Sequence, residues 1–237
     1  MTSVPEISVV LPVYRNRQTL EALHGRLSAA LSTLTNSFEL IFVNDCCPDG
    51  SLAVLRALEA RDPRVRVVAL GVRGGQMAAA RAGLSAARGR TVVTMDADLQ
   101  DPPEAIPQLI AALEGGYAAV YAGRRGHYES RRRLLTSRLF KHAIAIVTGM
   151  PSDGGSFVAM RREVARRVLA LPGRAPYLTG AVAWAVRAMD GGRVTSIPIV
   201  RHPRPDGASS YTGGMRVGLG ARSLLQALRW RFSGVGR

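Results

Sequence analysis

The chain has 237 residues, which is enough for one α/β domain with a substantial buried core. Hydrophobic residues make up 47% of it and charged residues 21%, as in globular proteins, and no apolar run approaches the roughly 18 residues that span a bilayer. The first residues also lack the basic and apolar pattern of a signal peptide. We therefore expect a cytoplasmic protein.

The formal net charge of +15 calls for an anionic partner: nucleic acid, an acidic membrane surface or a phosphorylated substrate. Arginine supplies almost all of the positive charge, because Lys141 is the single lysine, and guanidinium groups bind phosphate in a bidentate manner. Aromatic residues make up only 5% of the chain, which argues against a surface that stacks on bases. No nucleic-acid partner is expected, and a basic nucleic-acid-binding α/β protein is kept as the minor alternative.

Apolar, β-branched runs alternate with helical patterns through the first half of the chain. The expected strands are Ile7 to Val13, Phe38 to Val43, Val65 to Leu70, Thr91 to Met95 and Tyr117 to Ala122. The expected helices are Gln18 to Leu34, Ser51 to Arg61, Gln76 to Arg88 and Pro102 to Glu114. This alternation predicts an α/β fold with a mostly parallel sheet and helices on both faces. Right-handed crossovers then place the carboxyl ends of the strands at one edge.

The second half contains two basic amphipathic patterns, Arg131 to Val147 and Met215 to Phe232. Both combine leucines with basic residues, a composition seen in helices that lie on membranes. One interpretation is a peripheral contact with the inner membrane face. The alternative is a pair of helices that pack on their own domain and expose a solvated basic face.

Two carboxylates, Asp96 and Asp98, follow the expected strand Thr91 to Met95 directly. Alternate residues of an extended chain face the same way, so both can converge on one divalent cation. A cation held by two carboxylates completes its shell with water and substrate phosphate, which predicts a diphosphate substrate. The alternative is a polar turn that binds no metal.

A helix is expected to begin directly behind these carboxylates. Asp101 has the position of an N-cap, Pro102 and Pro103 fit a first helical turn, and Glu104 falls at the capping-box position. The carboxylates would therefore lie in a strand-to-helix turn, where α/β proteins place their sites.

Several short motifs occur in a fixed order along the chain. They are Val10 to Tyr14, Phe42 to Ser51, Asp96 to Glu104, Glu129 with Ser130, Ser137 to Phe140, and Arg204 to Tyr211. With these motifs the chain resembles the family 2 inverting glycosyltransferases of GT-A fold, and within them the polyprenyl-phosphate sugar transferases of the dolichyl-phosphate mannose synthase type. The resemblance runs from Ile7 to about Tyr211 and implies a Rossmann-like sheet followed by a smaller acceptor-side helical region.

The same resemblance implies boundaries and a reaction. A transferase domain would cover residues 1–212, with the nucleotide-sugar half at about 1–123 and the acceptor half at about 124–212, and a basic amphipathic helix would cover 213–237. The enzyme would move a sugar from a nucleoside diphosphate of the UDP or GDP type to a polyprenyl phosphate at the cytoplasmic membrane face.

For the donor nucleotide, the resemblance assigns Tyr14 and Asp45 to the base, with Pro12 in the same nucleotide-binding motif. An aromatic face can stack on a base, and a carboxylate can accept a hydrogen bond from a base N–H. The alternatives from the residues alone are that Tyr14 is a residue at the core edge and that Asp45 belongs to the N-terminal turn of a helix.

For the metal, the resemblance assigns Asp96 to both nucleotide and ion, and Asp98 with Gln100 to the ion. Oxygen ligands of this kind suit Mg²⁺ or Mn²⁺. Asp98 therefore counts among the candidate catalytic residues.

Further assignments concern the phosphates. Arg124 aligns with an arginine that contacts them, although it could equally be surface charge. Arg204, Gly207 and Ser209 match a loop that closes over the diphosphate, and Arg204 would neutralise the departing group in the transition state.

The need for a base depends on the acceptor. A phosphate oxygen is already anionic near neutral pH, whereas a hydroxyl must lose its proton to a carboxylate. Asp153 aligns with a family aspartate on the acceptor side and is the candidate base; the alternative is a turn-forming Asp before glycines.

The chain departs from the family pattern at three positions where cations are expected, Val158, Thr179 and Ser210. Such cations would grip phosphate groups. Their absence favours the alternative acceptor, a hydroxyl of a soluble small molecule or glycan.

Overall fold

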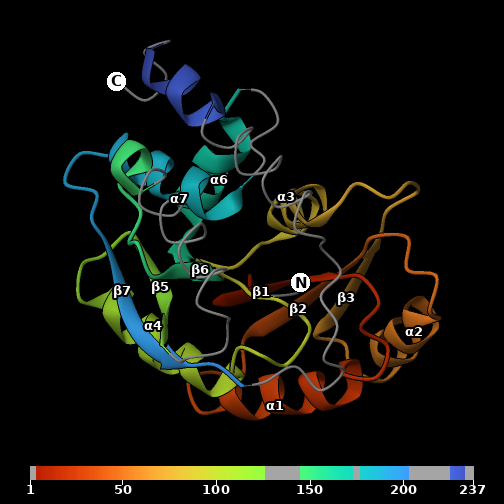
Figure 1. The fold of residues 1–237 in the computed structure, drawn as a ribbon. Coiled ribbons are helices and arrows are strands. Elements are labelled where there is room, and N and C mark those ends of the chain that lie inside the picture. The colour runs from red at the N-terminus through yellow and green to blue at the C-terminus, as the bar shows by residue number, and fades with distance from the viewer. Residues whose placement is uncertain (1–3, 126–144, 173–176, 203–224, 233–237) are drawn as a thin grey trace.

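The computed structural model describes residues 4–125, 145–172, 177–202 and 225–232. Its centre is a seven-stranded sheet with the order β3-β2-β1-β4-β6-β5-β7 (Figure 1). The strands are β1 (Ile7–Val13), β2 (Phe38–Asn44), β3 (Val65–Ala69), β4 (Thr91–Thr94), β5 (Ala119–Arg125), β6 (Gly154–Arg161) and β7 (Val194–Val200). Only β6 is antiparallel to its neighbours β4 and β5. The expected mostly parallel sheet is confirmed.

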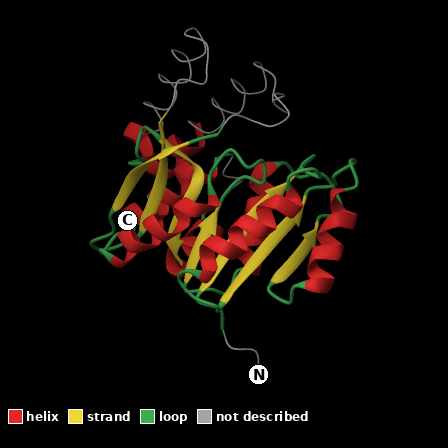
Figure 2. Cartoon of the chain, turned by 90° about the horizontal axis from the view of Figure 1, so that it is seen from below, coloured by secondary structure: helices red, strands yellow, loops and turns green. Residues whose placement is uncertain are grey.

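Helices cover both faces of the sheet, and Figure 2 shows strands flanked by helices on either side. The helices are α1 (Leu20–Ser32), α2 (Ser51–Arg61), α3 (Gln76–Ala86), α4 (Ile106–Glu114), α6 (Arg162–Ala170) and α7 (Leu178–Arg187). Helices α1, α2 and α4 lie on one face, and α3, α6 and α7 lie on the other (Figure 1). The layered α/β architecture follows from strands that are apolar on both sides.

The side chains of β1 show how the two layers form. Val9, Leu11 and Val13 join the core on the α1 side, whereas Val10 joins the core on the α3 side. Helix α3 packs closely on this second side because Gly83 has no side chain, and a Cβ there would collide with Val10. The nearly continuous apolar run in the sequence therefore corresponds to a strand that is buried on both faces.

Local patterns predict the first half well and the second half less well. The bounds Ile7–Val13 and Ser51–Arg61 agree with the sequence prediction, whereas the strand expected from Tyr117 to Ala122 begins and ends later, as β5. Beyond residue 150 the chain adds β6 and β7 to the same sheet, together with α6 and α7. These strands were not predicted from the sequence, because short runs without strict alternation cannot be told from helix segments by periodicity alone.

The expected capping box behind Asp98 is wrong. A 3₁₀ turn (Pro103–Ala105) does lead into α4, but neither has a side-chain hydrogen bond at its N-cap. Asp101 accepts hydrogen bonds from Arg201 instead, and Glu104 pairs with Arg26 of α1. Tertiary ion pairs therefore replace the local caps.

Most of the two basic amphipathic segments lies outside the described residues. Their described ends, residues 145–148 and 225–232, are helical. In the second, Trp230 is buried against Trp184 of α7, with ring centroids 6.0 Å apart, and its Nε1 donates to the Pro172 carbonyl at 3.1 Å. This end thus packs on its own domain, although Phe232 is exposed. No helix in the described part of the chain is long and apolar enough to cross a bilayer.

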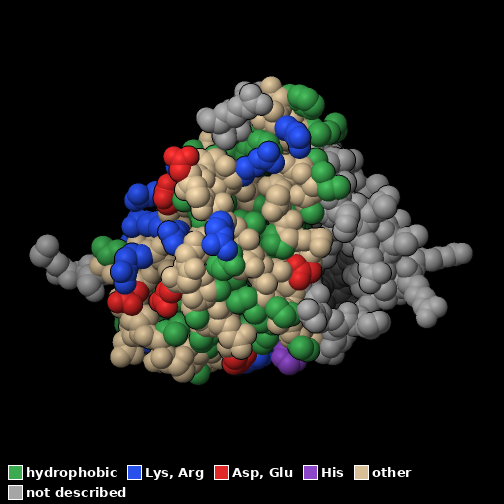
Figure 3. Space-filling model, turned by 90° about the vertical axis from the view of Figure 1, so that its left-hand side faces the viewer, with side chains coloured by type: hydrophobic (Ala, Val, Ile, Leu, Met, Phe, Trp, Pro, Cys, Tyr) green, Lys and Arg blue, Asp and Glu red, His purple; other side chains and the backbone are tan. Residues whose placement is uncertain are grey.

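Many arginines are neutralised locally. On the face shown in Figure 3, acidic and basic side chains of the described residues are interspersed rather than segregated. Arg167 pairs with Glu163 at 3.0 Å within α6, and Arg64 pairs with Asp62 at 2.8 Å. The net positive charge therefore does not by itself mark this face as a nucleic-acid surface.

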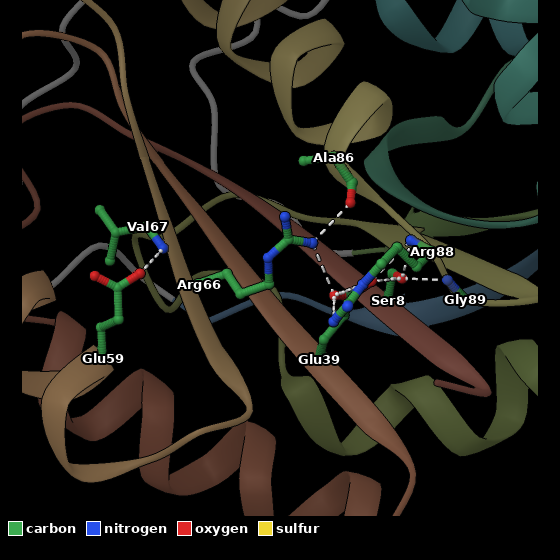
Figure 4. Close-up of polar contacts among 8 residues, drawn as sticks. All are labelled: Ser8, Glu39, Glu59, Arg66, Val67, Ala86, Arg88 and Gly89. Atoms are coloured by element: carbon green, nitrogen blue, oxygen red, sulfur yellow. Dashed lines mark hydrogen bonds and ion pairs between the residues drawn. The ribbon is translucent and has the colours of Figure 1, made fainter. Parts of the chain in front are cut away.

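A buried carboxylate joins three strands at the amino edge of the sheet (Figure 4). Glu39 of β2 is 2% exposed; it accepts hydrogen bonds from Ser8 Oγ of β1 at 2.6 Å and from the backbone N–H of Arg88 at 2.8 Å. The guanidinium groups of Arg88 and of Arg66 on β3 lie 2.9 and 3.1 Å from Glu39 Oε2. Gly89 donates to Ser8 Oγ at 2.7 Å, and a Cβ on this glycine would meet Ser8 N at 2.6 Å.

Burial raises the pKa of Glu39, but the hydrogen bonds from Ser8, Arg88 and Arg66 outweigh it, so the pKa lies below the ordinary value of 4.5. The ionised form is therefore the one that this cluster stabilises. Its contribution to stability is fully present above pH 4.5 and is lost as the pH falls through the lowered pKa.

Replacing Glu39 with Gln should lower the free energy of unfolding at pH 7 by about 2 kcal/mol, because a neutral amide would face a ring of N–H and O–H donors. Chemical denaturation measures this difference. The matched control is Glu163→Gln on the surface of α6, which should cost less than about 0.5 kcal/mol. The difference between Glu39→Gln and the unchanged chain should shrink at acid pH, and an equal difference at pH 7 and pH 3 would contradict the assignment.

Candidate functional site

Three parallel strands end side by side, and each is followed by predicted site residues. In the register of the sheet, Val13 of β1 pairs with Asn44 of β2, and Val10 of β1 pairs with Thr94 of β4. Tyr14, Asp45 and Asp96 therefore emerge at the same carboxyl edge. Parallel α/β sheets bind their ligands at this edge.

The backbone is unusual directly after these residues. In the described part of the chain, three residues other than glycine have a positive φ: Arg15 (58°), Cys46 (50°) and Leu99 (58°). They follow Tyr14, Asp45 and Asp98. Side-chain-bearing residues rarely adopt this conformation, which costs about 1–3 kcal/mol and persists where the surroundings enforce it. The strain thus coincides with the turns that carry the predicted site.

Asp96 and Asp98 are both partly exposed, whereas Ala97 between them is only 2% exposed. The two carboxylates are therefore less buried than the alanine between them. Asp96 Oδ1 accepts a hydrogen bond from Gln76 Nε2 at 2.6 Å, and its Oδ2 accepts one from Ser156 Oγ at 2.7 Å. Both oxygens are held by neutral donors, which leave the negative charge in place.

Asp98 is fixed locally, because its Oδ1 accepts from the backbone N–H of Gln100 at 3.1 Å. Gln100 in turn contacts the end of β7: its carbonyl accepts from the His202 N–H at 2.8 Å, and its Nε2 lies 3.4 Å from the His202 carbonyl. The Asp-x-Asp loop is therefore tied to a segment that lies 102 residues later in the chain.

Next to this contact, Arg201 binds Asp101 with its Nε 2.6 Å from Oδ1 and its Nη2 3.1 Å from Oδ2. The side chains are 15% and 3% exposed. This buried pair fixes the point at which the chain leaves β7 for residues 203–224.

Asp45 is 3% exposed, and both of its oxygens bind the loop before α3. Gly74 N donates to Oδ1 at 2.6 Å, and Gly75 N donates to Oδ2 at 2.9 Å. Asp45 therefore holds the loop that leads into α3. It does not belong to the N-terminal turn of α2, the helix that follows it in the sequence.

Tyr14 is partly exposed and carries two cations near its ring. The Arg73 guanidinium lies 4.1 Å from the ring centroid and that of Arg15 lies 5.5 Å from it. Pro12, two residues earlier, lies in β1 opposite Val43 of β2. Tyr14 is thus a residue of the site edge with one aromatic face in contact with a guanidinium.

Asp153 directly precedes β6, and its side chain lies against the backbone of β5, since a Cβ on Gly123 would collide with the Asp153 carboxylate. Asp153 is partly exposed, and no described residue donates a hydrogen bond to it. Because β6 is antiparallel to β4, its start lies at the edge where β4 ends. Asp153 therefore stands at the same edge as Asp96.

Other predicted residues cannot be placed in the site. Arg124 belongs to β5 by its backbone. Arg204, Gly207 and Ser209 lie outside the described residues.

Two of the family departures are core positions. Val158 of β6 is 0% exposed and Thr179 of α7 is 1% exposed. A cation at either position would be buried. The missing cations at Val158 and Thr179 therefore take no charge away from the exposed surface of the site. Ser210 lies outside the described residues.

The described His, Cys, Asp and Glu residues form no group of three that could hold a metal. A divalent ion bound by Asp96 and Asp98 would need further ligands, and the side-chain oxygen of Gln100 is chemically suited to this role. The donor set of two carboxylates and one amide fits a hard cation that keeps positions for water and phosphate.

Sequence reasoning missed Gln76, Ser156, Arg73, Arg201 and His202. The Gly74-Gly75 pair before a helix was a usable signal, because such pairs mark close backbone approaches at α/β edges. Ser156 and Arg201 carried no comparable signal.

Residues 8–169 match the model of the family described as Glycosyl transferase family 2. An uncharacterized glycosyltransferase, YkcC, of Bacillus subtilis is 32% identical over 209 residues, which are 87% of this chain and 63% of the relative. The undecaprenyl-phosphate 4-deoxy-4-formamido-L-arabinose transferase of Pseudomonas fluorescens is 37% identical over 210 residues, which are 87% and 60% of the two chains. This chain spans less than two thirds of the length of both relatives.

Two solved structures have a similar fold. Glucosyl-3-phosphoglycerate synthase from Mycobacterium tuberculosis, in complex with Mn²⁺, UDP and phosphoglyceric acid, gives a TM-score of 0.67 at 22% identity and covers 95% of this chain and 78% of its own. The mannosyltransferase PcManGT from Pyrobaculum calidifontis, in complex with GDP-Man and Mn²⁺, gives 0.66 at 20% identity, with 98% and 65% covered. At these identities the likeness concerns the fold.

Replacing Arg201 with Ala should lower the free energy of unfolding by about 3 kcal/mol, because it removes two charged hydrogen bonds from the buried Asp101 carboxylate. Equilibrium denaturation measures the change. The matched control is Arg26→Ala, which breaks a similar but more exposed pair with Glu104 and should cost less than about 1 kcal/mol. Equal losses in the two variants would show that the Arg201 pair is no tighter than a surface pair.

Proposed function

Because the chain belongs to glycosyltransferase family 2, we propose that it transfers a sugar from a nucleoside diphosphate sugar to a polyprenyl phosphate, with inversion, at the cytoplasmic membrane face. The observation that supports this proposal is the carboxyl edge of the sheet, where the neighbouring strands β2, β1 and β4 are followed by Asp45, Tyr14 and Asp96. Two carboxylates and an aromatic ring at one edge suit a donor that has a diphosphate and a base.

Asp96, Asp98 and the Gln100 side-chain oxygen would hold Mg²⁺ or Mn²⁺. The ion, when bound, supplies positive charge to the departing diphosphate. Asp96 and Asp98 keep their oxygens at the end of β4, while Gln76, Ser156 and the Gln100 N–H orient them. In this proposal Arg124 and Arg204 add charge at the phosphates, and Gly207 and Ser209 allow a close approach.

The nucleotide base would lie beside Tyr14 and Pro12. Asp45 contributes in two ways: it holds the loop of Gly74 and Gly75 in place, and an oxygen with a second lone pair can still accept from a base N–H. A fixed acceptor of this kind reduces the reorganisation that binding requires. Of the two solved structures of similar fold, one holds UDP and the other holds GDP-Man, so UDP and GDP sugars are both candidates.

The acceptor proposal is supported by the curated relatives named undecaprenyl-phosphate transferases. A phosphate acceptor needs no general base, because its oxygen is anionic near neutral pH. Catalysis would then depend on positioning the acceptor opposite the leaving group and on stabilising the diphosphate.

The second candidate is transfer to a hydroxyl of a soluble small molecule or glycan. It is favoured by Asp153, whose partly exposed carboxylate stands at the site edge without a hydrogen-bond donor among the described residues. Such a carboxylate can take the proton of a hydroxyl as it attacks. The two candidates share the donor chemistry and differ only in the need for Asp153.

The donor proposal predicts that Mn²⁺ and UDP or GDP together raise the melting temperature by on the order of 5–10 °C at a hundredfold excess over Kd, whereas either one alone has little effect. Differential scanning fluorimetry measures the shift. Asp96→Asn should abolish it, and the exposed Asp190→Asn should retain it. A metal-independent shift, or tight salt-dependent binding to nucleic acid instead, would favour the nucleic-acid alternative.

Asp153→Asn separates the two acceptors. With undecaprenyl phosphate as acceptor, the rate of nucleoside diphosphate release should change little, because no proton has to be removed. With a hydroxyl acceptor, the loss should be on the order of 10²- to 10⁴-fold while donor binding is unchanged. The control is again Asp190→Asn, and a large loss with the phosphate acceptor would contradict the leading proposal.

A further inference from the structure

We infer that Gln76 and Ser156 are positioning residues that aim the Asp96 carboxylate at the metal, so that the ion site depends on both halves of the domain. This inference rests on the proposed function. It concerns two residues that the family resemblance does not assign. The two donors approach different oxygens of one carboxylate, at 2.6 Å from Gln76 to Oδ1 and at 2.7 Å from Ser156 to Oδ2.

Gln76 is the first residue of α3, and its place is determined by the loop before it. Gly75 has a φ of 80°, which turns the chain into the helix. Asp45 holds this loop through the N–H groups of Gly74 and Gly75. Hydrogen bonds therefore connect Asp45, after β2, to the Gly74-Gly75 loop, and Gln76, which follows this loop, to Asp96 after β4.

Ser156 belongs to β6 and binds the other oxygen of Asp96. Thr94 Oγ1 donates to the Ser156 carbonyl at 3.0 Å, and Thr94 itself is paired with Val158, so β6 is firmly placed against β4. Asp153 lies three residues before Ser156. A shift of this segment relative to the metal would therefore move the acceptor-side carboxylate as well.

The two hydrogen bonds are not required to satisfy a buried charge. Asp96 is partly exposed, and water could solvate its oxygens in the absence of Gln76 and Ser156. What the two donors add is direction, since each uses one lone-pair position and leaves the others aimed at a fixed point. Removing a hydrogen-bond partner of a metal-binding side chain typically lowers metal affinity or activity by on the order of 10- to 100-fold.

The test measures the Kd of Mn²⁺ by isothermal titration calorimetry, in the presence of whichever of UDP and GDP stabilises the unchanged chain. Gln76→Ala and Ser156→Ala should each raise this Kd by on the order of 10- to 100-fold. Ser156→Thr keeps the hydroxyl and should restore most of the affinity. Because both bonds act on one carboxylate, the double variant should lose less than the product of the single losses.

The matched controls are Ser152→Ala in the exposed turn before β6 and Gln108→Ala on the exposed side of α4. Both should bind Mn²⁺ like the unchanged chain. Melting temperatures without ligand show whether each variant is folded. If Ser156→Ala does not fold, position 156 is tested with Ser156→Thr. If folded Gln76→Ala and Ser156→Ala bind Mn²⁺ as tightly as the unchanged chain, this inference alone is overturned. If the unchanged chain binds neither Mn²⁺ nor the nucleotide, the proposed function is overturned as well.

Discussion

The buried Glu39 carboxylate fixes the register on which the rest of the molecule depends. It holds β1 through Ser8, β3 through Arg66 and the entry to β4 through Arg88, all at the amino edge of the sheet. A slip of one residue in any of these strands would reverse the direction of its side chains. The cluster at one edge therefore determines which residues stand at the opposite edge, where the strands end.

At that opposite edge, the site is made from strand ends and long-range contacts rather than from one continuous motif. Asp96 receives a donor from α3 on one side and from β6 on the other, and the loop behind Asp98 is tied to the end of β7. The parallel half of the sheet and the part that contains the antiparallel β6 thus meet at one carboxylate. The geometry of a metal site at Asp96 would therefore depend on how these two parts are placed relative to each other. This dependence suits a reaction that must align a donor with an acceptor.

The sequence predicted what depends on neighbours in the chain. The strand Ile7–Val13 and the helix Ser51–Arg61 follow from local patterns. The partners of Asp96 and Asp101 lie 20, 60 and 100 residues away, so no local pattern contained them. The capping box failed for the same reason, because Asp101 binds Arg201, which is distant in the chain.

The Arg73 guanidinium that lies over Tyr14 has one more consequence, for the apparent strength of nucleotide binding. A planar cation already occupies one side of the aromatic platform, and a base that takes this side has to displace it. At an exposed position such a stack is worth about 0.5–1 kcal/mol, which would weaken the observed affinity by a factor of roughly two to five. The displaced Arg73 side chain would then be a positive charge close to the pyrophosphate of the nucleotide. The same arginine that competes with the base for the Tyr14 ring would thus attract the phosphate groups.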